Sequence, residues 1–166
     1  MNFPNKKISD GVFEGVELSE PSAYQDHRGY YYTIYDDDNR SYVKDKLTTS
    51  SKDVLRGIHG DYKSTKLLTC VHGEVYCVIV DNRKDSDTFI EWAWDILSLH
   101  NRKVLVLPPG VGLSYLVLSD SANIFYKWSY DGGYPDIDEQ FSLKWNDPDL
   151  QIFWPIKEPI VQPRDV

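Results

Sequence analysis

Short apolar runs separated by turn residues recur along the chain, and helical periodicity is nearly absent. The clearest case is TKLLTCVHGEVYCVIVD, in which Thr65–Val71 and Val75–Asp81 flank the turn HGE. This pattern predicts an antiparallel hairpin, with Gly73 at the position that most needs a positive φ. A chain built from such units is limited to a fold dominated by strands.

Further strands are predicted at Gly29–Asp36, Phe89–Ser98, Lys103–Gly110, Leu113–Asp120, Asn123–Asp131 and Phe141–Trp145. Only Asp36–Lys44 has a composition that would allow a helical turn. Many short strands in one domain favour an all-β sandwich or a small antiparallel barrel such as a jelly roll, with little helix. Such a barrel can hold a ligand in its mouth.

Length and charge limit the partners. The 166 residues predict one domain, and the net charge of −8 argues against nucleic acid or an anionic membrane as a general partner. An anionic small ligand would need a locally basic pocket. The first residues, MNFPNKKISD, lack the apolar region of a signal peptide, and no run is long enough to span a membrane. We therefore expect a cytoplasmic protein, with Cys70 and Cys77 as small apolar strand residues.

The stretch VLRGIHGDYKSTK places His59 between Arg56 and Lys66. Cationic neighbours discourage protonation of an imidazole, so this pattern suits a neutral base, a phosphate site or both. The alternative is a histidine of the core or of a turn. On a straight strand Arg56 and His59 would point to opposite faces, and a turn at Gly57 or Gly60 would be needed to bring them together.

A metal site is the other reading of the histidines. His59 and His72 are far apart in sequence, and Glu74 follows the second. Barrel metal sites usually carry a His-x-His pair on one strand, which is absent here. We expect neither a metal nor another cofactor.

Two basic stretches precede His59. In DHRGYYYTIYD, Arg28 could contact phosphate and Tyr30 or Tyr31 could stack on a nucleotide base, or the segment could be an edge strand. In YVKDKLTTS, Lys44 and Lys46 could contact a ligand, although alternating charge usually marks a solvated face.

Two further residues could carry chemistry. Tyr126 is next to Lys127, whose ammonium could lower the phenol pKa, or it could be an ordinary barrel aromatic. Asp147 precedes a proline, which is typical of a turn, but its carboxylate could also orient His59.

Six motifs resemble, in order, the dTDP-4-dehydrorhamnose 3,5-epimerase family over about Tyr24–Trp154. They are DHRG, VLRGIH, KLLTCVHGEVYCVIVDNRKDSDTF, LPPG with LVLSD, FYK, and WNDPDLQIFWP. The resemblance implies one cupin-type jelly roll over residues 1–166. It also implies a homodimer in which strands of about residues 1–50 are exchanged with the partner.

The same resemblance implies roles for individual residues. His59 matches the general base that removes a proton beside the C4 ketone of a nucleotide sugar, and Asp147 matches its acidic partner. Tyr126 matches the general acid on the other face of the sugar, and Lys66 matches the lysine near the ketone oxygen. No metal or redox cofactor is implied.

Two arginines match phosphate contacts. These are Arg56 and Arg28, the latter expected to reach the site from the neighbouring subunit. The chain also departs from the family, because RGIHGDYKSTK replaces RGLHYQ and Leu113 with Ser114 stands where the family has a histidine. We expect Leu113 and Ser114 to contact the substrate at that place.

The form RGIHGD and the lysines Lys44 and Lys46 look most similar to a branch acting on GDP-linked 4-keto-6-deoxy-heptoses. We therefore expect an epimerase acting at C3, or at C3 and C5, with a GDP-heptose favoured over a dTDP-hexose. The alternatives are a cupin 3,4-ketoisomerase and a non-catalytic module that binds sugar nucleotides.

Overall fold

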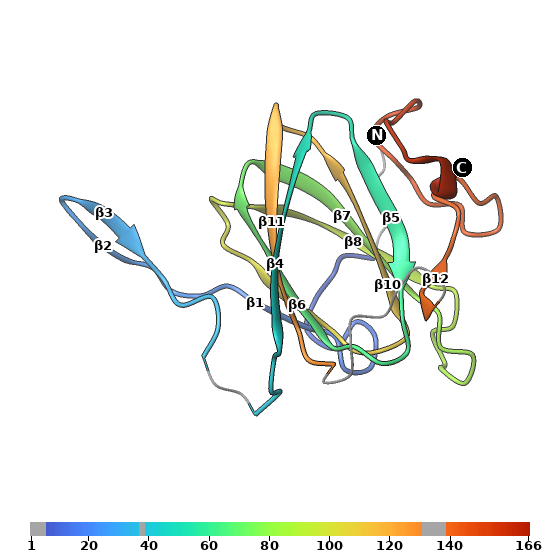
Figure 1. The fold of residues 1–166 in the computed structure, drawn as a ribbon, viewed down its shortest axis with the longest axis horizontal. Coiled ribbons are helices and arrows are strands. Elements are labelled where there is room, and N and C mark those ends of the chain that lie inside the picture. Colours follow the sequence, from blue (N-terminus) through green and yellow to red (C-terminus); the bar gives the residue numbers. More distant parts are fainter. Residues whose placement is uncertain (1–5, 37–38, 131–138) are drawn as a thin grey trace.

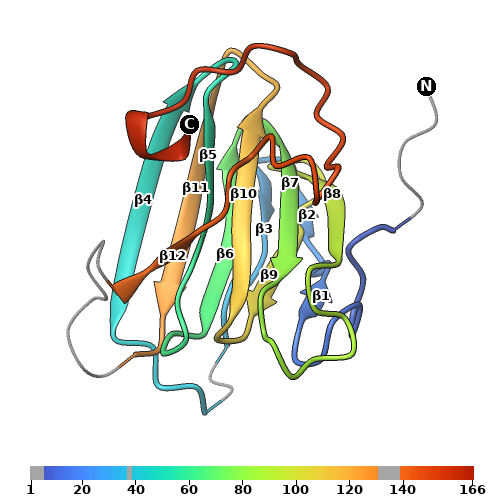
Figure 2. The ribbon, with the colours of Figure 1, turned by 90° about the vertical axis from the view of Figure 1, so that its right-hand side faces the viewer.

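Two five-stranded antiparallel sheets face each other in the computed structural model, which describes residues 6–36, 39–130 and 139–166 (Figures 1 and 2). The first sheet has the order β1 (Glu17–Ser19), β9 (Val104–Leu107), β6 (Lys66–His72), β11 (Ser121–Trp128) and β4 (Lys44–Ser51). The second has the order β12 (Phe141–Ser142), β5 (Leu55–Gly60), β10 (Val111–Val117), β7 (Glu74–Asp81) and β8 (Trp92–Ser98). The all-β jelly roll is confirmed.

In the described residues, helix amounts to the short 3-10 helix η2 (Pro163–Asp165) and a single residue of 3-10 conformation at Glu139. In that part of the chain no helix has the length and apolar character needed to cross a membrane. The helical turn considered for Asp36–Lys44 is absent from its described residues, and residues 37–38 lie outside them.

The main core lies between the sheets. Strand β11 shows how the sequence builds it, because Ala122, Ile124, Tyr126 and Trp128 are buried while the residues between them are partly exposed. Successive side chains on a strand point to opposite faces, so every second residue of β11 enters the barrel.

A second core covers the outer face of the β5–β10–β7–β8 sheet. The C-terminal segment, red in Figure 2, crosses this face. Its Trp154 packs edge-on against Tyr76, with ring centroids 5.8 Å apart, and the backbone oxygen of Leu150 accepts a hydrogen bond from Trp92 Nε1 at 2.9 Å. Burial on both faces explains the continuous apolar runs of β7 and β10. The same segment carries η2 to β5.

The hairpin around Gly73 is confirmed. Gly73 joins β6 to β7 with φ +75°, and a Cβ there would lie 2.1 Å from the carbonyl oxygen of Ser121. Strand β4 lies outside the strands that the sequence predicts, because its alternating lysines and aspartate are typical of a solvated face. Several expected strands are shorter in the structure, among them β3 (Gly29–Tyr31), β9 and β12.

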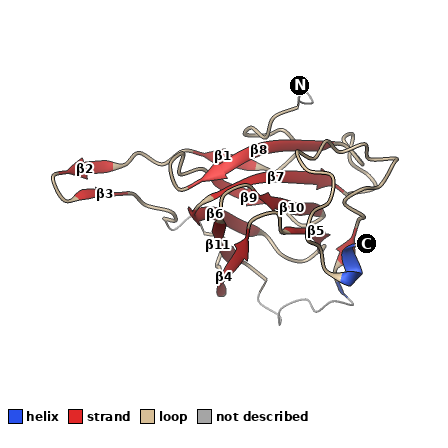
Figure 3. Ribbon diagram, turned by 90° about the horizontal axis from the view of Figure 1, so that it is seen from above, coloured by secondary structure: helices blue, strands red, loops and turns tan. Residues whose placement is uncertain are grey.

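Strand β3 pairs with β2 (Tyr24–Asp26) in a hairpin that projects from the barrel (Figures 1 and 3). Its side chains Tyr24, Tyr30 and Tyr31 are exposed. The neighbouring strands β1 and β4 instead pair with β9 and β11 of the same chain.

Candidate active site

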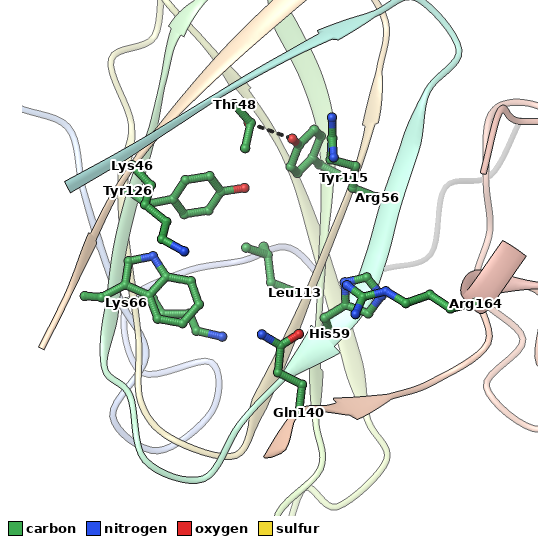
Figure 4. A pocket seen from close by; sticks show the side chains of 11 residues that line it. Lys46, Thr48, Arg56, His59, Lys66, Leu113, Tyr115, Tyr126, Gln140 and Arg164 are labelled. Carbon is green, nitrogen blue, oxygen red and sulfur yellow. Dashed lines mark hydrogen bonds between the residues drawn. The ribbon is translucent and has the colours of Figure 1, made fainter. Parts of the chain in front are cut away.

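A cavity of about 230 Å³ opens between the two sheets (Figure 4). Its walls combine cations, aromatic rings and neutral polar groups, and no carboxylate of the described residues lines it. The lining residues are Lys46, Thr48, Arg56, His59, Lys66, Leu113, Tyr115, Tyr126, Trp128, Gln140 and Arg164. Four cations in a chain of net charge −8 make this the locally basic pocket that an anionic ligand would need.

An irregularity in β5 brings Arg56 and His59 to the same cavity. His59 pairs with Leu113 of β10 and Arg56 pairs with Tyr115, so two residues of β5 lie opposite one residue of β10, and β5 has one extra residue. Gly57 lies in this bulge with φ +105°, and a Cβ on it would lie 2.3 Å from the carbonyl oxygen of Leu113. The bulge at Gly57 therefore does what the sequence required of a turn, because it brings Arg56 and His59 to one cavity.

His59 lies between a carboxylate and a guanidinium. Its Nε2 is 2.6 Å from Oδ1 of Asp165, and its Nδ1 is 3.2 Å from a terminal nitrogen of Arg164. Burial lowers the pKa of His59 below its usual 6.5; Asp165 opposes this, and the charges of Arg164 and Lys66 reinforce it. The imidazole is therefore neutral at pH 7, as a base must be.

The carboxylate beside His59 is Asp165, and the expectation for Asp147 was wrong in this respect. Asp147 lies in the turn that follows β12, where its Oδ1 accepts a hydrogen bond from the backbone N–H of Asp149 at 2.9 Å. That is the turn-forming role typical of an aspartate before proline.

Lys66 is fixed in the cavity wall by a buried ion pair. Its Nζ lies 3.1 Å from Oδ2 of Asp61 and 4.3 Å from the ring centroid of Trp128. Asp61 also accepts hydrogen bonds from the backbone N–H groups of Lys63 and Ser64, at 2.8 and 2.6 Å. Burial lowers the pKa of Lys66 and Asp61 opposes that change.

Tyr126 enters the cavity from the sheet opposite His59 (Figure 4). Burial raises its pKa well above 10, and the neighbouring Tyr115 adds to the rise. The hydroxyl therefore keeps its proton at neutral pH. The expected lowering by Lys127 was wrong, because adjacent strand residues point to opposite faces and Lys127 pairs with Asp45, 2.8 Å away, outside the cavity.

The other predicted ligand contacts divide into two groups. Lys46, Arg56 and Leu113 line the cavity, whereas Lys44 and Ser114 do not. Ser114 is buried and donates a hydrogen bond to the backbone oxygen of Arg56 at 2.8 Å, so in this structure it supports β5.

Arg28 and Tyr31 lie in the projecting hairpin, away from the cavity of their own chain. The Arg28 guanidinium pairs with Asp26, and the Tyr31 ring packs on Tyr24 at 5.4 Å between centroids. Within one chain these two residues do not contribute to the site.

The family model described as dTDP-4-dehydrorhamnose 3,5-epimerase matches residues 11–166. The chain belongs to this family of epimerases. The family is a class of isomerases, and the jelly roll seen here is its fold.

Named relatives agree with this assignment. The dTDP-4-dehydrorhamnose 3,5-epimerase of Escherichia coli K12 is 36% identical, over 86% of this chain and 81% of its own. The relative of the same name from Neisseria gonorrhoeae is also 36% identical over 96% of this chain, which spans only 51% of that protein. A relative from Streptomyces niveus, 31% identical over 92% of this chain and 77% of its own, is named a dTDP-4-dehydrorhamnose 3-epimerase.

A solved epimerase from Legionella pneumophila, in complex with dTDP-4-keto-L-rhamnose, superposes with a TM-score of 0.85. It is 31% identical and the match covers 97% of this chain and 89% of that one. All these relatives have dTDP sugars in their names, so they give no support to the expected preference for a GDP-heptose.

Several residues of this epimerase site were not predicted from the sequence. Thr48 could have been found, because Lys46 and Thr48 are two apart and share a face once β4 is recognised as a strand. Asp165 and Arg164 carry no such signal, since only the path of the C-terminal segment brings them to β5.

Metal ligation was also considered for the histidines. Over the described ranges, His, Cys, Asp and Glu side chains form no group of three or more that could hold a metal ion. His72 lies at the far end of β6, where its Nε2 is 3.3 Å from the hydroxyl oxygen of Ser121.

Proposed function

We propose that the protein epimerises a nucleotide-diphosphate-linked 4-keto-6-deoxy sugar at C3, or at C3 and C5, without a metal or redox cofactor. His59 removes the proton, Tyr126 returns one to the other face of the sugar, and Lys66 stabilises the negative charge that develops between these steps.

One observation carries the proposal: His59 and Tyr126 line the same cavity from opposite sheets. Inversion at carbon requires removal of a proton on one face and delivery on the other, so acid and base must lie on opposite sides of the sugar. The neutral imidazole and the protonated phenol are each in the required state at pH 7.

The chemistry follows from the ketone. Hydrogen on a carbon next to C4 is acidic because its electron pair can move onto the ketone oxygen. When His59 takes this proton, the C3–H bond breaks and an enolate forms, with its charge on the C4 oxygen. The Lys66 ammonium, held by Asp61, stabilises this charge. Transfer of the Tyr126 proton to the opposite face of C3 gives the inverted centre.

The cations of the cavity fit the rest of the substrate. Arg56 and Arg164 present guanidinium groups and Lys46 an ammonium, which are the side chains that bind diphosphate. The relatives' names favour a dTDP-linked hexose as the first substrate to test, with a GDP-linked heptose beside it.

Leu113 leaves open how many centres are inverted. It lines the cavity opposite His59 in the strand pairing and offers no proton donor. C5 is also next to the ketone, so the same base could act there if the sugar were to turn or shift.

We also propose a homodimer in which the β2–β3 hairpin reaches the partner's cavity and supplies Arg28 and Tyr31. Support comes from the projection of this hairpin (Figure 3) and from the exposure of its tyrosine side chains. A barrel exposes such rings at a cost unless another surface covers them.

The experiment is incubation with dTDP-linked 4-keto-6-deoxyglucose in D2O, followed by NMR and mass spectrometry. Deuterium at C3 with inverted configuration is expected, with or without label at C5, and His59→Asn should abolish both. A product whose ketone has moved would indicate a ketoisomerase. If the protein bound the dTDP-linked and the GDP-linked substrate but exchanged hydrogen for deuterium in neither, it would be a binding module, and the proposal would be contradicted.

A further inference from the structure

The geometry of His59 points to a resting site whose base is covered. We propose that Arg164 caps the lone pair of His59 Nδ1 in the free enzyme, and that the diphosphate of the incoming substrate draws the guanidinium away and so exposes the base. The inference rests on the proposed function, because it takes His59 as the base and a nucleotide diphosphate as the ligand.

The first step is the tautomer. A guanidinium has only N–H donors and does not lose a proton in proteins. The 3.2 Å contact between Arg164 and Nδ1 of His59 is therefore a hydrogen bond in which Nδ1 is the acceptor. The ring proton must then be on Nε2, which donates to Asp165 at 2.6 Å.

The second step is that Nδ1 is the nitrogen left for catalysis. Nε2 is engaged by the buried Asp165, so only Nδ1 can take a proton from a substrate in the cavity. Its lone pair is occupied by Arg164 as long as the contact persists. Arg164 must leave before His59 can act.

The third step is what moves Arg164. It belongs to the one-turn helix η2, is exposed as a residue, and reaches into the cavity (Figure 4). Its Nε is 3.8 Å from Oδ1 of Asp165, which is longer than a normal hydrogen bond. A diphosphate offers two strong charge-assisted hydrogen bonds to a guanidinium, whereas a neutral imidazole offers one weaker bond.

The groups that face His59 fix the expected titration. From η2 these are Asp165 and Arg164, and from β6 the ammonium of Lys66; the neighbours in strand pairing, Leu113 and Ser142, carry no charge. Arg164 and Lys66 favour the neutral imidazole, and Asp165 favours the charged one. Departure of Arg164 therefore raises the pKa of His59 and makes it a stronger base when substrate is bound.

The test is an NMR titration of His59 in the full chain, followed through the ring nitrogens. The chain has four histidines, so His59→Asn identifies the signals. Free wild-type protein should show the tautomer protonated at Nε2. Added thymidine diphosphate should raise the pKa of His59.

Two variants separate the cap from general electrostatics. Arg164→Gln should raise the pKa of His59 in the free protein and reduce the further rise caused by thymidine diphosphate. Arg56→Gln is the matched control: Arg56 lines the same cavity, but its Nε bonds to Ser50 and not to His59. It should leave the free-state pKa unchanged while weakening thymidine diphosphate binding about tenfold or more.

Equal free-state pKa values in wild type and Arg164→Gln would overturn the cap. If thymidine diphosphate raised the pKa of His59 equally in these two proteins, the displacement of Arg164 by diphosphate would be overturned. If neither thymidine diphosphate nor GDP bound to the wild type or any variant, the proposed function and the displacement of Arg164 by diphosphate would fail together, while the free-state titration would still test the cap by itself.

Discussion

Asp165 and His59 form a close pair, with 2.6 Å between Oδ1 and Nε2, although η2 and β5 are far apart in sequence. The C-terminal segment covers the outer face of the second sheet and then turns η2 toward the cavity. The site thus depends on the packing of that segment as well as on the barrel.

Replacing Asp165 by Asn should lower kcat at least about tenfold, because the tautomer and orientation of His59 would no longer be fixed; comparable changes elsewhere reach about 10⁴. Steady-state rates on the dTDP-linked substrate measure this. Asp147→Asn is the matched control and should keep near-normal activity, since Asp147 serves only its own turn. A larger loss in the control would restore Asp147 as the partner of the base.

His59→Asn should preserve substrate binding and remove most of the turnover, by about 10²–10⁴. The pH profile of the wild type should agree with this assignment. Burial lowers the pKa of His59 below 6.5, so the imidazole stays neutral in mild acid. As the pH is lowered, kcat/KM should therefore begin to fall only below pH 6.5. Exchange of C3 hydrogen at the wild-type rate in His59→Asn would show that another group is the base.

The role of Tyr126 can be separated from that of His59 by isotope exchange. Tyr126→Phe leaves the first deprotonation possible and removes the donor on the opposite face. Recovered substrate should therefore carry deuterium at C3 while little epimer forms. Loss of both exchange and product would mean that Tyr126 is needed before the enolate forms.

The sequence was sufficient for the all-β fold class, although not for strand β4, because most strands and turns, including the turn at Gly73, are local features. It was also sufficient for residues whose face is set by strand alternation, such as Tyr126 on β11. It misplaced the carboxylate, because the position of Asp165 depends on tertiary packing of an irregular segment. The sequence could not show whether Arg56 and His59 point to the same face of their strand. The bulge at Gly57 brings both to the cavity.

Asp61 should matter through Lys66. Replacing Asp61 by Asn leaves burial unopposed, so the pKa of Lys66 should fall further and the alkaline limb of kcat should move to lower pH. Removing one member of a buried pair should also reduce the free energy of unfolding, by about 3–5 kcal/mol. Urea denaturation and a pH–rate profile measure the two effects. Asp45→Asn, which breaks the outer pair with Lys127, should change neither by much, and an unshifted alkaline limb in Asp61→Asn would contradict the role of the pair.

The proposed dimer predicts complementation between two inactive proteins. If Arg28 serves the partner's cavity, Arg28→Gln lacks the guanidinium in both sites and His59→Asn lacks the base in both. After the two variants are unfolded together and refolded, mixed dimers contain one intact site, formed by His59 of one subunit and Arg28 of the other. Equal mixing should restore about a quarter of the wild-type sites, as expected for a two-fold symmetric dimer with random pairing.

The control is the same procedure with His59→Asn and Tyr126→Phe, whose residues line one cavity within a chain and should not complement. Failure of the first pair to regain activity would place Arg28 outside the active site, and full activity of a monomer in sedimentation would exclude the exchange altogether.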